Sequence, residues 1–442
     1  MKFQTLIRKV GFATIFSGFL SLMSIAQTKP NAPELVAGIP VNYEEANVKP
    51  YALPDPLVHT NGKVVNSAED WIKRKRPEIL DWYQRAQFGK APGIPAGFRA
   101  VVTDQGTPVF GGKAIRKQVT LYLYEKSEEP KIDLALYLPA QQAGPAPVLV
   151  RLSFFANATT IDDSDLQKDS VWNSKEKIKV AAASFRQDMA FPVEEFIEAG
   201  IGVVSLYYGD IEPDFKEGIQ YGIRSRFLPH DATTFAADEW GAISAWAWGL
   251  SRVMDYLEKD KDVDSKKVAI NGHSRLGKTV LYAGANDPRF SIVIPSCSGE
   301  GGAALSRRNY GETIAHLVAP TRYAYQFSAN YSQYQDDPST MEVDSHMLIS
   351  LIAPRPILLI TGDSDKWSDP KGEFLAAVAA GPVYRLFGKK DLGTDTLPPL
   401  DKPILHDVGF LIHKGGHQVL PQDIQTMITF MKKHWLNTAP AE

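Results

Sequence analysis

The sequence has a single cysteine, no excess of positive charge and few long apolar segments. Its single cysteine, Cys297, excludes an internal disulfide, so the fold must be held together by its core. Lysine and arginine total 48 against 51 aspartates and glutamates, and the net charge of −3 offers no basic field for nucleic acid. Beyond the N-terminal leader, no stretch stays apolar over the roughly 20 residues that span a bilayer.

The N-terminus has the pattern of a secretory signal peptide. Lys2, Arg8 and Lys9 precede an apolar run over residues 10–25, and small residues around Ala26 suit cleavage. A retained membrane anchor is the alternative, but the run is short for a bilayer span. We therefore expect a signal peptide over residues 1–26, with export to the periplasm or out of the cell and no membrane association after cleavage.

Strand and helix patterns alternate over most of the chain. Three strand patterns, at residues 117–125, 131–140 and 147–155, precede an alternation of helices and strands that ends in a helix at 421–436. This order predicts an α/β fold, a three-layer sandwich in which helices cover both faces of a mostly parallel central sheet. In such folds the chemistry collects at the carboxyl ends of the strands.

The N-terminal part of the mature chain lacks the sustained spacing of apolar residues that marks a helix or a strand. It is rich in proline and polar residues, which predicts an extended arm over residues 27–60. A helix pattern over residues 70–89 follows and ends at Gly89. We expect residues 61–442 to form a single catalytic domain, because a large α/β enzyme can run this long as one domain.

One short stretch, "NGHSRLGKT" at residues 271–279, matches two motifs. Gly272, Gly277, Lys278 and Thr279 satisfy the pattern G-x-x-x-x-G-K-[ST] of a phosphate-binding loop, whereas Ser274 stands where a serine nucleophile stands between strand and helix. The variable positions of a phosphate loop favour small residues and its strand comes early in a domain. Here those positions carry bulky residues and come late in the chain, which favours the serine nucleophile.

A serine nucleophile requires a carboxylate and a histidine, in the chain order Ser, Asp or Glu, His. Asp363 and Asp365 follow a strand pattern in "LLITGDSDKW", and His417 follows the last strand pattern in "FLIHKGGHQVLP". The histidine removes the serine proton, and the carboxylate holds the histidine in one tautomer. Three ordered loops that supply these residue types are much rarer than one short motif.

The surroundings of Ser274 resemble a known family. Leu276 stands where the elbow pattern G-x-S-x-G has its second glycine, and Gly277 follows it. The run Ser-Arg-x-Gly-Lys at residues 274–278 is similar to the signature G-C-S-R-x-G-K of the glucuronoyl esterases, carbohydrate esterase family 15, with His273 in place of the fungal cysteine. The resemblance extends over most of the mature chain through "RPEIL", "GDIEPD", "NDPRF", "SGEGGAA", "SHMLISLIAPRP" and "GGH". It implies an α/β-hydrolase fold and a glucuronoyl esterase of the bacterial type.

The resemblance also implies roles for residues near the nucleophile. Arg275 is expected to bind the oxyanion, where a preorganised donor is worth a few kcal/mol of the barrier; the alternative is a surface salt bridge. Lys278 is expected to hydrogen-bond sugar hydroxyls, or else to be a solvated lysine. Glu312 aligns loosely with a residue that contacts the sugar, and Trp367 is expected to form a wall of the sugar site.

The catalytic acid is where this sequence departs from the fungal pattern. Fungal members carry a glutamate in P-x-E-S-G-x-G-G, and Cys297 occupies its position here. A neutral thiol cannot stabilise an imidazolium as a carboxylate does, so the acid must come from elsewhere. The spacing Asp-x-Trp to Trp367 favours Asp365, with Asp363 and Glu300 as competitors.

These features together predict a serine esterase with the triad Ser274, His417 and Asp365 and with Arg275 at the oxyanion. The expected substrate is an ester of (4-O-methyl-)glucuronic acid on glucuronoxylan, at lignin–carbohydrate bonds. We expect no cofactor and no metal, since glycines separate His413 from His417 and prevent a helical ligand pair. We also expect a monomer without a nucleic-acid partner.

Two other functions stay open. One is an acetyl or methyl esterase on another plant polysaccharide, with the same triad and different pocket walls. The other is a carbohydrate-binding protein on an inactive hydrolase scaffold, which the missing glutamate suggests.

Overall fold

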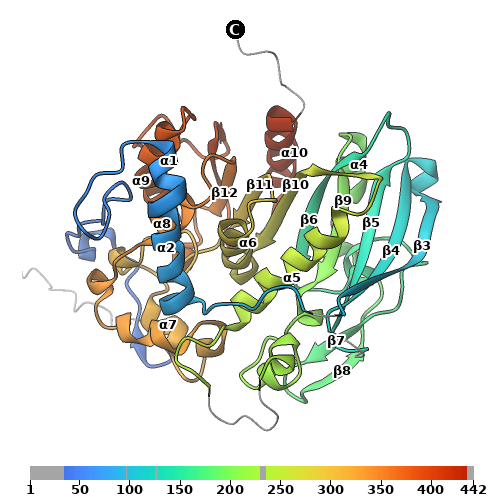
Figure 1. Cartoon of the computed structure of the whole chain (residues 1–442), viewed down its shortest axis with the longest axis horizontal. Coiled ribbons are helices and arrows are strands. Elements are labelled where there is room, and N and C mark those ends of the chain that lie inside the picture. Colours follow the sequence, from blue (N-terminus) through green and yellow to red (C-terminus); the bar gives the residue numbers. More distant parts are fainter. Residues whose placement is uncertain (1–33, 96, 125–127, 229–234, 436–442) are drawn as a thin grey trace, which may run out of the picture. The chain divides into compact units, whose positions relative to one another are not determined.

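A ten-stranded sheet forms the centre of the computed structural model (Figure 1). The structure describes residues 34–95, 97–124, 128–228 and 235–435. The predicted signal peptide, residues 1–26, lies outside the described residues, as do residues 27–33 of the predicted arm. No helix within the described ranges is long and apolar enough to cross a membrane.

Six neighbouring strands of the sheet are parallel, and the strands at its two edges are antiparallel to their neighbours. The parallel strands are, in spatial order, β14 (Val408–His413), β12 (Ile357–Gly362), β11 (Ile292–Ser296), β10 (Val263–His273), β6 (Ala146–Ser153) and β9 (Gly202–Tyr207). The antiparallel strands are β13 (Ile404–Leu405) beside β14, and β5 (Lys131–Pro139), β4 (Ala114–Tyr122) and β3 (Arg99–Val109) beyond β9. A separate hairpin joins β7 (Ser170–Asn173) to β8 (Ile178–Ala181).

Helices cover both faces of this sheet, as the sequence predicts. They are α1 (Ala68–Asp70), α2 (Arg76–Trp82), α3 (Asn157–Thr160), α4 (Val193–Glu198), α5 (Ala242–Leu257), α6 (Arg275–Asn286), α7 (Ile314–Val318), α8 (Ser345–Ser350), α9 (Pro370–Leu386) and α10 (Pro421–Trp435). Successive residues of a strand point to opposite faces. Val150 of β6 accordingly packs in the cluster that contains α5 and α6, whereas Leu149 packs in the cluster that contains α4 and α10. The predicted mostly parallel sheet with two helical layers is confirmed.

Two predicted elements differ from the structure. The sequence "AADEWGAISAWAWGLSRVMDYLEKD" predicts a helix over residues 236–260, but the helix begins only at Ala242. Gly241 has extended backbone, and a Cβ there would lie 2.3 Å from the carbonyl oxygen of Gln326. The eleven-residue edge strand β3 is missing from the sequence prediction. Most of its residues are exposed, and register shifts on both sides of Asp104 break the period of two.

Residues 34–60 of the predicted arm contact the loops that border the functional site. Arg308 pairs with Glu45 at 2.5 Å, and the Gly311 N–H donates to the carbonyl oxygen of Asn42 at 2.8 Å. Two short strands, β1 (Leu35–Val36) and β2 (Ile39–Pro40), lie in this part of the chain. The arm thus helps to hold the segment just before Glu312. Its boundary at residue 60 stays a prediction.

A buried carboxylate in α9 holds the loop that follows β11. Glu373 is 1% exposed, and its Oε1 accepts hydrogen bonds from the Ser298 hydroxyl (3.0 Å) and the Gly299 N–H (2.7 Å). Burial raises the pKa of Glu373 from 4.5 to about 7 despite these two donors. The protonated form is therefore the stable one in the folded protein at acidic pH.

This raised pKa gives a prediction about stability. The contribution of Glu373 is fully present below its unfolded pKa and is lost as the pH rises through about 7. Between about pH 5 and about pH 8, the unfolding free energy of wild type should fall by roughly 2 kcal/mol more than that of Glu373→Gln. Denaturant unfolding at the two pH values measures the difference, with the exposed Glu69→Gln as control. Parallel pH profiles for wild type and Glu373→Gln would contradict the prediction.

Candidate active site

Ser274 occupies a strained turn between β10 and α6. Its backbone has φ 59° and ψ −128°, a region that residues with a side chain rarely adopt. A Cβ on Gly272 would lie 2.3 Å from the carbonyl oxygen of Leu276, so only glycine fits there. The Ser274 N–H donates to the carbonyl oxygen of Ser296 at 2.8 Å, which ties the turn to the neighbouring strand. The serine thus stands at the carboxyl edge of the sheet.

This geometry excludes the phosphate loop. β10 ends at His273 and α6 begins at Arg275, so a single residue separates strand from helix. A phosphate loop needs several residues there whose N–H groups surround the phosphate. The pattern G-x-x-x-x-G-K-[ST] is therefore a coincidence in this chain.

The structure also explains why the second glycine of the elbow pattern is displaced. Leu276 is fully buried in the core, whereas Gly277 is the residue at which α6 approaches β11. A Cβ on Gly277 would lie 2.8 Å from the carbonyl oxygen of Ser296. The close helix–strand contact therefore falls one residue later than in G-x-S-x-G.

His417 contacts the carboxylate of Asp365. Its Nδ1 lies 2.7 Å from Asp365 Oδ2, with the Ser368 hydroxyl 3.4 Å from the same nitrogen. Burial alone would raise the pKa of Asp365, but the hydrogen bond and charge of His417, with the hydrogen bonds of Ser368, lower it below its ordinary value. An ionised Asp365 accepts a hydrogen bond from Nδ1–H, which favours the tautomer in which the lone pair is on Nε2 of His417.

The two competing carboxylates have other partners. Asp363 accepts a hydrogen bond from the Gly415 N–H at 2.8 Å. Glu300 is 3% exposed and accepts from the hydroxyls of Ser306 (2.6 Å) and Tyr331 (3.1 Å), and burial raises its pKa to about 8. Asp363 therefore joins the loops that follow β12 and β14, and Glu300 joins the loop after β11 to Tyr331.

One cleft of about 190 Å³ contains most of the residues singled out from the sequence. Asp365 lies behind His417, with a side chain only 4% exposed. The cleft is lined by Ser274, Arg275, Lys278, Cys297, Glu312, Leu317, Arg322, Tyr323, Gln326, Trp367, Ser368 and His417. The expected catalytic and sugar-binding residues thus meet in one place, although they come from distant parts of the chain.

Arg275 is held in place by a residue that sequence reasoning missed. Its Nη1 lies 2.5 Å from Asp214 Oδ2, and its guanidinium lies over the ring of Tyr323 at 4.7 Å. Asp214 also accepts hydrogen bonds from Tyr325 (2.7 Å) and Gln326 (2.8 Å). Asp214 ends the "GDIEPD" segment, so the resemblance contained a signal for it. The guanidinium is fixed at the cleft without the help of a ligand.

Arg322 is a second residue of the cleft that the sequence did not single out. Its Nη2 lies 3.0 Å from Glu312 Oε1, and Lys278 Nζ lies 3.7 Å from Glu312 Oε2. The Arg322 guanidinium also lies 5.0 Å from the ring centre of Trp367. Its Nη1 is buried and has no hydrogen-bond partner among the described residues. A charge among the aromatic residues of "TRYAYQF" was the available signal.

Comparison with known proteins gives consistent matches. The model of a family described as "Glucuronyl esterase, fungi" matches residues 232–388. The carbohydrate esterase MZ0003, from an unknown prokaryotic organism, is 41% identical over 89% of this chain and 92% of its own length. The 4-O-methyl-glucuronoyl methylesterase 1 of Wolfiporia cocos is 33% identical over 77% of this chain and 73% of its own.

A solved structure matches equally well. The glucuronoyl esterase from Solibacter usitatus is 43% identical and superimposes with a TM-score of 0.83, covering 88% of this chain and 100% of that chain. With these matches the predicted α/β-hydrolase fold is confirmed.

Proposed function

Because the chain belongs to the glucuronoyl esterases of carbohydrate esterase family 15 and is a carboxylic ester hydrolase, we propose that it cleaves esters of (4-O-methyl-)glucuronic acid on glucuronoxylan. The observation that carries the proposed mechanism is the 2.7 Å contact between His417 Nδ1 and Asp365 beside Ser274. The alcohol partner would come from lignin.

In the proposed mechanism, Ser274 Oγ attacks the ester carbonyl while His417 Nε2 takes its proton. The tetrahedral intermediate collapses when His417 returns the proton to the leaving alcohol, which yields an acyl-enzyme. Water activated by His417 then releases the glucuronate and restores the serine. Asp365 holds His417 in the required tautomer and stabilises the imidazolium, so the reaction needs no metal or cofactor.

Arg275 and the first N–H groups of α6 would bind the oxyanion. N–H groups in the first turn of a helix have no intrahelical acceptor, and the helix dipole favours negative charge there. The ester itself is neutral, so the guanidinium acts on the charge that develops in the transition state. Its contact with Asp214 keeps it preorganised before the substrate arrives.

The sugar would bind against Trp367, with Lys278, Glu312 and Arg322 as hydrogen-bonding partners. Glu312, when ionised, can only accept hydrogen bonds from sugar hydroxyls, whereas Lys278 and Arg322 can only donate hydrogen bonds. A 4-O-methyl ether oxygen has lost its proton and needs a donor. Arg322 lines the cleft and would supply such a donor.

The missing fungal glutamate no longer argues for an inactive, carbohydrate-binding protein. Asp365 supplies a carboxylate to His417 in its place. An acetyl or methyl esterase on another polysaccharide is the remaining alternative. We also propose that residues 1–26 direct export of a monomeric enzyme to the periplasm or the medium, where its polymeric substrate occurs.

The substrate assignment predicts a clear preference. Because the cleft presents several charged groups to a sugar, kcat/KM for benzyl or methyl glucuronate should exceed that for acetylated xylan or 4-nitrophenyl acetate by at least about a hundredfold. Steady-state assays with the four substrates measure this ratio. Faster turnover of the acetyl esters would refute the proposed substrate.

The acid assignment predicts unequal effects of two neighbouring aspartates. Asp365→Asn should lower kcat on benzyl glucuronate by about 10⁴-fold, since an amide cannot hold His417 in the productive tautomer. The matched variant Asp363→Asn keeps a hydrogen-bond acceptor for Gly415 and should cost less than about tenfold. If Asp365→Asn retains wild-type kcat, the assignment is wrong.

The sugar-binding role of Arg322 predicts an effect confined to sugar substrates. Arg322→Gln should raise KM for benzyl 4-O-methyl-glucuronate by about tenfold or more, the cost of a lost charge-assisted hydrogen bond. Hydrolysis of 4-nitrophenyl acetate, which has no sugar, should change little. The exposed Arg85→Gln is the control. Equal losses on both substrates would show that Arg322 only supports the fold.

A further inference from the structure

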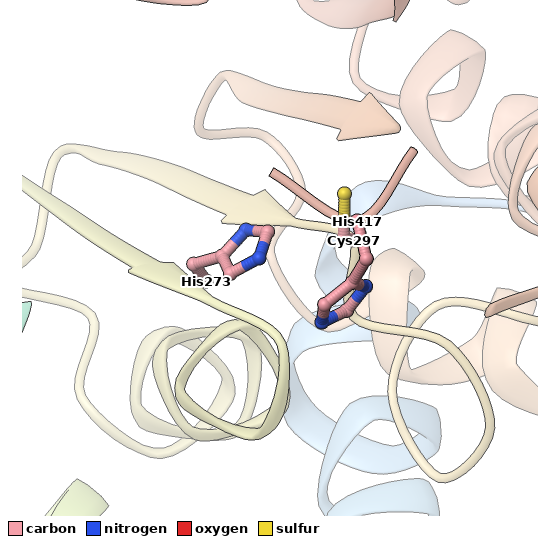
Figure 2. Close-up of side chains that lie close together, drawn as sticks. All are labelled: His273, Cys297 and His417. Carbon is pink, nitrogen blue, oxygen red and sulfur yellow. The ribbon is translucent and has the colours of Figure 1, made fainter. Parts of the chain in front are cut away.

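Three side chains with metal-ligating atoms meet at the carboxyl edge of the sheet. His273 is the last residue of β10, Cys297 directly follows β11, and His417 lies in the loop after β14. One ligand atom from each lies within 4.8 Å of the other two. The imidazole rings of His273 and His417 are neighbours tilted by 52°, with ring centres 4.6 Å apart (Figure 2). These three side chains, with two nitrogens and one sulfur, are called the His–Cys–His cluster.

His273 has a ring nitrogen that is available to a metal ion. Its Nδ1 is buried and has no hydrogen-bond partner among the described residues. A buried ring nitrogen without a hydrogen-bond partner is costly, and coordination of a metal ion would satisfy it. The proposed ester hydrolysis does not use it.

His417 is oriented in the way metal-bound histidines commonly are. Asp365 holds Nδ1 at 2.7 Å, and a carboxylate at one ring nitrogen fixes the other for a metal. The side chain is 40% exposed, so an ion can reach it from solvent. His413 is not a member of the cluster, because Asp423 (3.0 Å) and the carbonyl oxygen of Gly416 (3.2 Å) occupy its two nitrogens.

Cys297 supplies a free sulfur at the cleft. It is the single cysteine of the chain, is 1% exposed and is among the residues that line the cleft. Binding of a metal ion would displace the thiol proton to solvent and leave a metal thiolate.

The distances are close to what zinc requires. Zinc binds nitrogen at about 2.1 Å and sulfur at about 2.3 Å, which places ligand atoms about 3.5 Å apart in a tetrahedron. Small side-chain rotations would bring atoms that lie within 4.8 Å of one another to that separation. Water can fill the fourth position. A donor set of imidazole and thiolate selects zinc over magnesium or calcium, which prefer oxygen.

We propose that His273, Cys297 and His417 form an inhibitory Zn²⁺ site within the active centre. A bound zinc ion takes the Nε2 lone pair of His417, which is the lone pair that must accept the proton of Ser274. Metal binding and nucleophile activation therefore exclude each other. The inhibitory effect rests on the proposed function, whereas metal binding by the cluster does not.

The first test measures binding without reference to activity. Untagged protein is titrated with Co²⁺, and a thiolate-to-cobalt charge-transfer band is expected to saturate at one ion per chain. Since the chain has one cysteine, the band reports Cys297 alone. It should be retained in Ser274→Ala and absent in Cys297→Ser. Absence of the band in the wild type would overturn the proposal, even if the protein proves to be an active esterase.

The second test measures inhibition of benzyl glucuronate hydrolysis at buffered free Zn²⁺. Inhibition should be reversed by a chelator, and Mg²⁺ and Ca²⁺ should not reproduce it. Cys297→Ser and His273→Gln, each normalised to its own uninhibited rate, should need about tenfold more Zn²⁺ or more. His406→Gln, which removes a histidine outside the cluster, should behave as wild type. Equal sensitivity of wild type and Cys297→Ser would overturn the site.

Two results separate this proposal from the proposed function. If no ester is hydrolysed but the cobalt band appears in wild type and is lost in Cys297→Ser, the esterase assignment fails and the metal site stands. If benzyl glucuronate is hydrolysed and Zn²⁺ inhibits without the cobalt band, the esterase assignment stands and the metal site fails.

Discussion

The backbone conformation of Ser274 is the constraint on which the active centre depends. A φ of 59° at a residue with a side chain is unfavourable, and it persists only where the surroundings impose it. Gly272 leaves room for the turn, and the N–H of Ser274 is bonded to the next strand at Ser296. Since α6 starts at once, the serine, Arg275 and, one helical turn on, Lys278 are fixed relative to one another.

The order of strands explains how a chain with a cysteine at the fungal acid position still holds its histidine. β12 pairs with β14 along its whole length, from Ile357 beside Val408 to Gly362 beside His413. The loops that follow these two strands are therefore neighbours, and Asp365 reaches His417 directly. β11 lies one strand further away, and the position that follows it is free to carry Cys297.

The positive charges of the cleft contact carboxylates before any substrate binds. Arg275 pairs with Asp214, and Glu312 lies between Lys278 and Arg322. A charge buried without a partner would cost several kcal/mol, so these carboxylates are what allows cations to stand in a partly buried site. They also hold the donors in position, which is the condition for electrostatic stabilisation of a transition state. Burial also lowers the pKa of His273 to about 3, so its imidazole is neutral beside the ring of His417.

The sequence by itself determined the fold class and the identity of the nucleophile and base candidates. Strand and helix periods are local properties, and a triad leaves an ordered signal of three residue types along the chain. Edge strand β3 was not predicted, because exposed residues and register shifts remove the alternation of buried and exposed residues that marks a strand. The choice of Asp365 over Asp363 rested on its spacing to Trp367.

Tertiary structure alone decided which groups touch. The partners of Arg275 and Glu312 lie far from them in the chain or within an aromatic loop, at Asp214 and Arg322, and no local period marks such pairs. The meeting of His273, Cys297 and His417 likewise follows from the side-by-side order of parallel strands. Contacts between strand ends depend on that order, and it is set by packing of the whole sheet between its two helical layers.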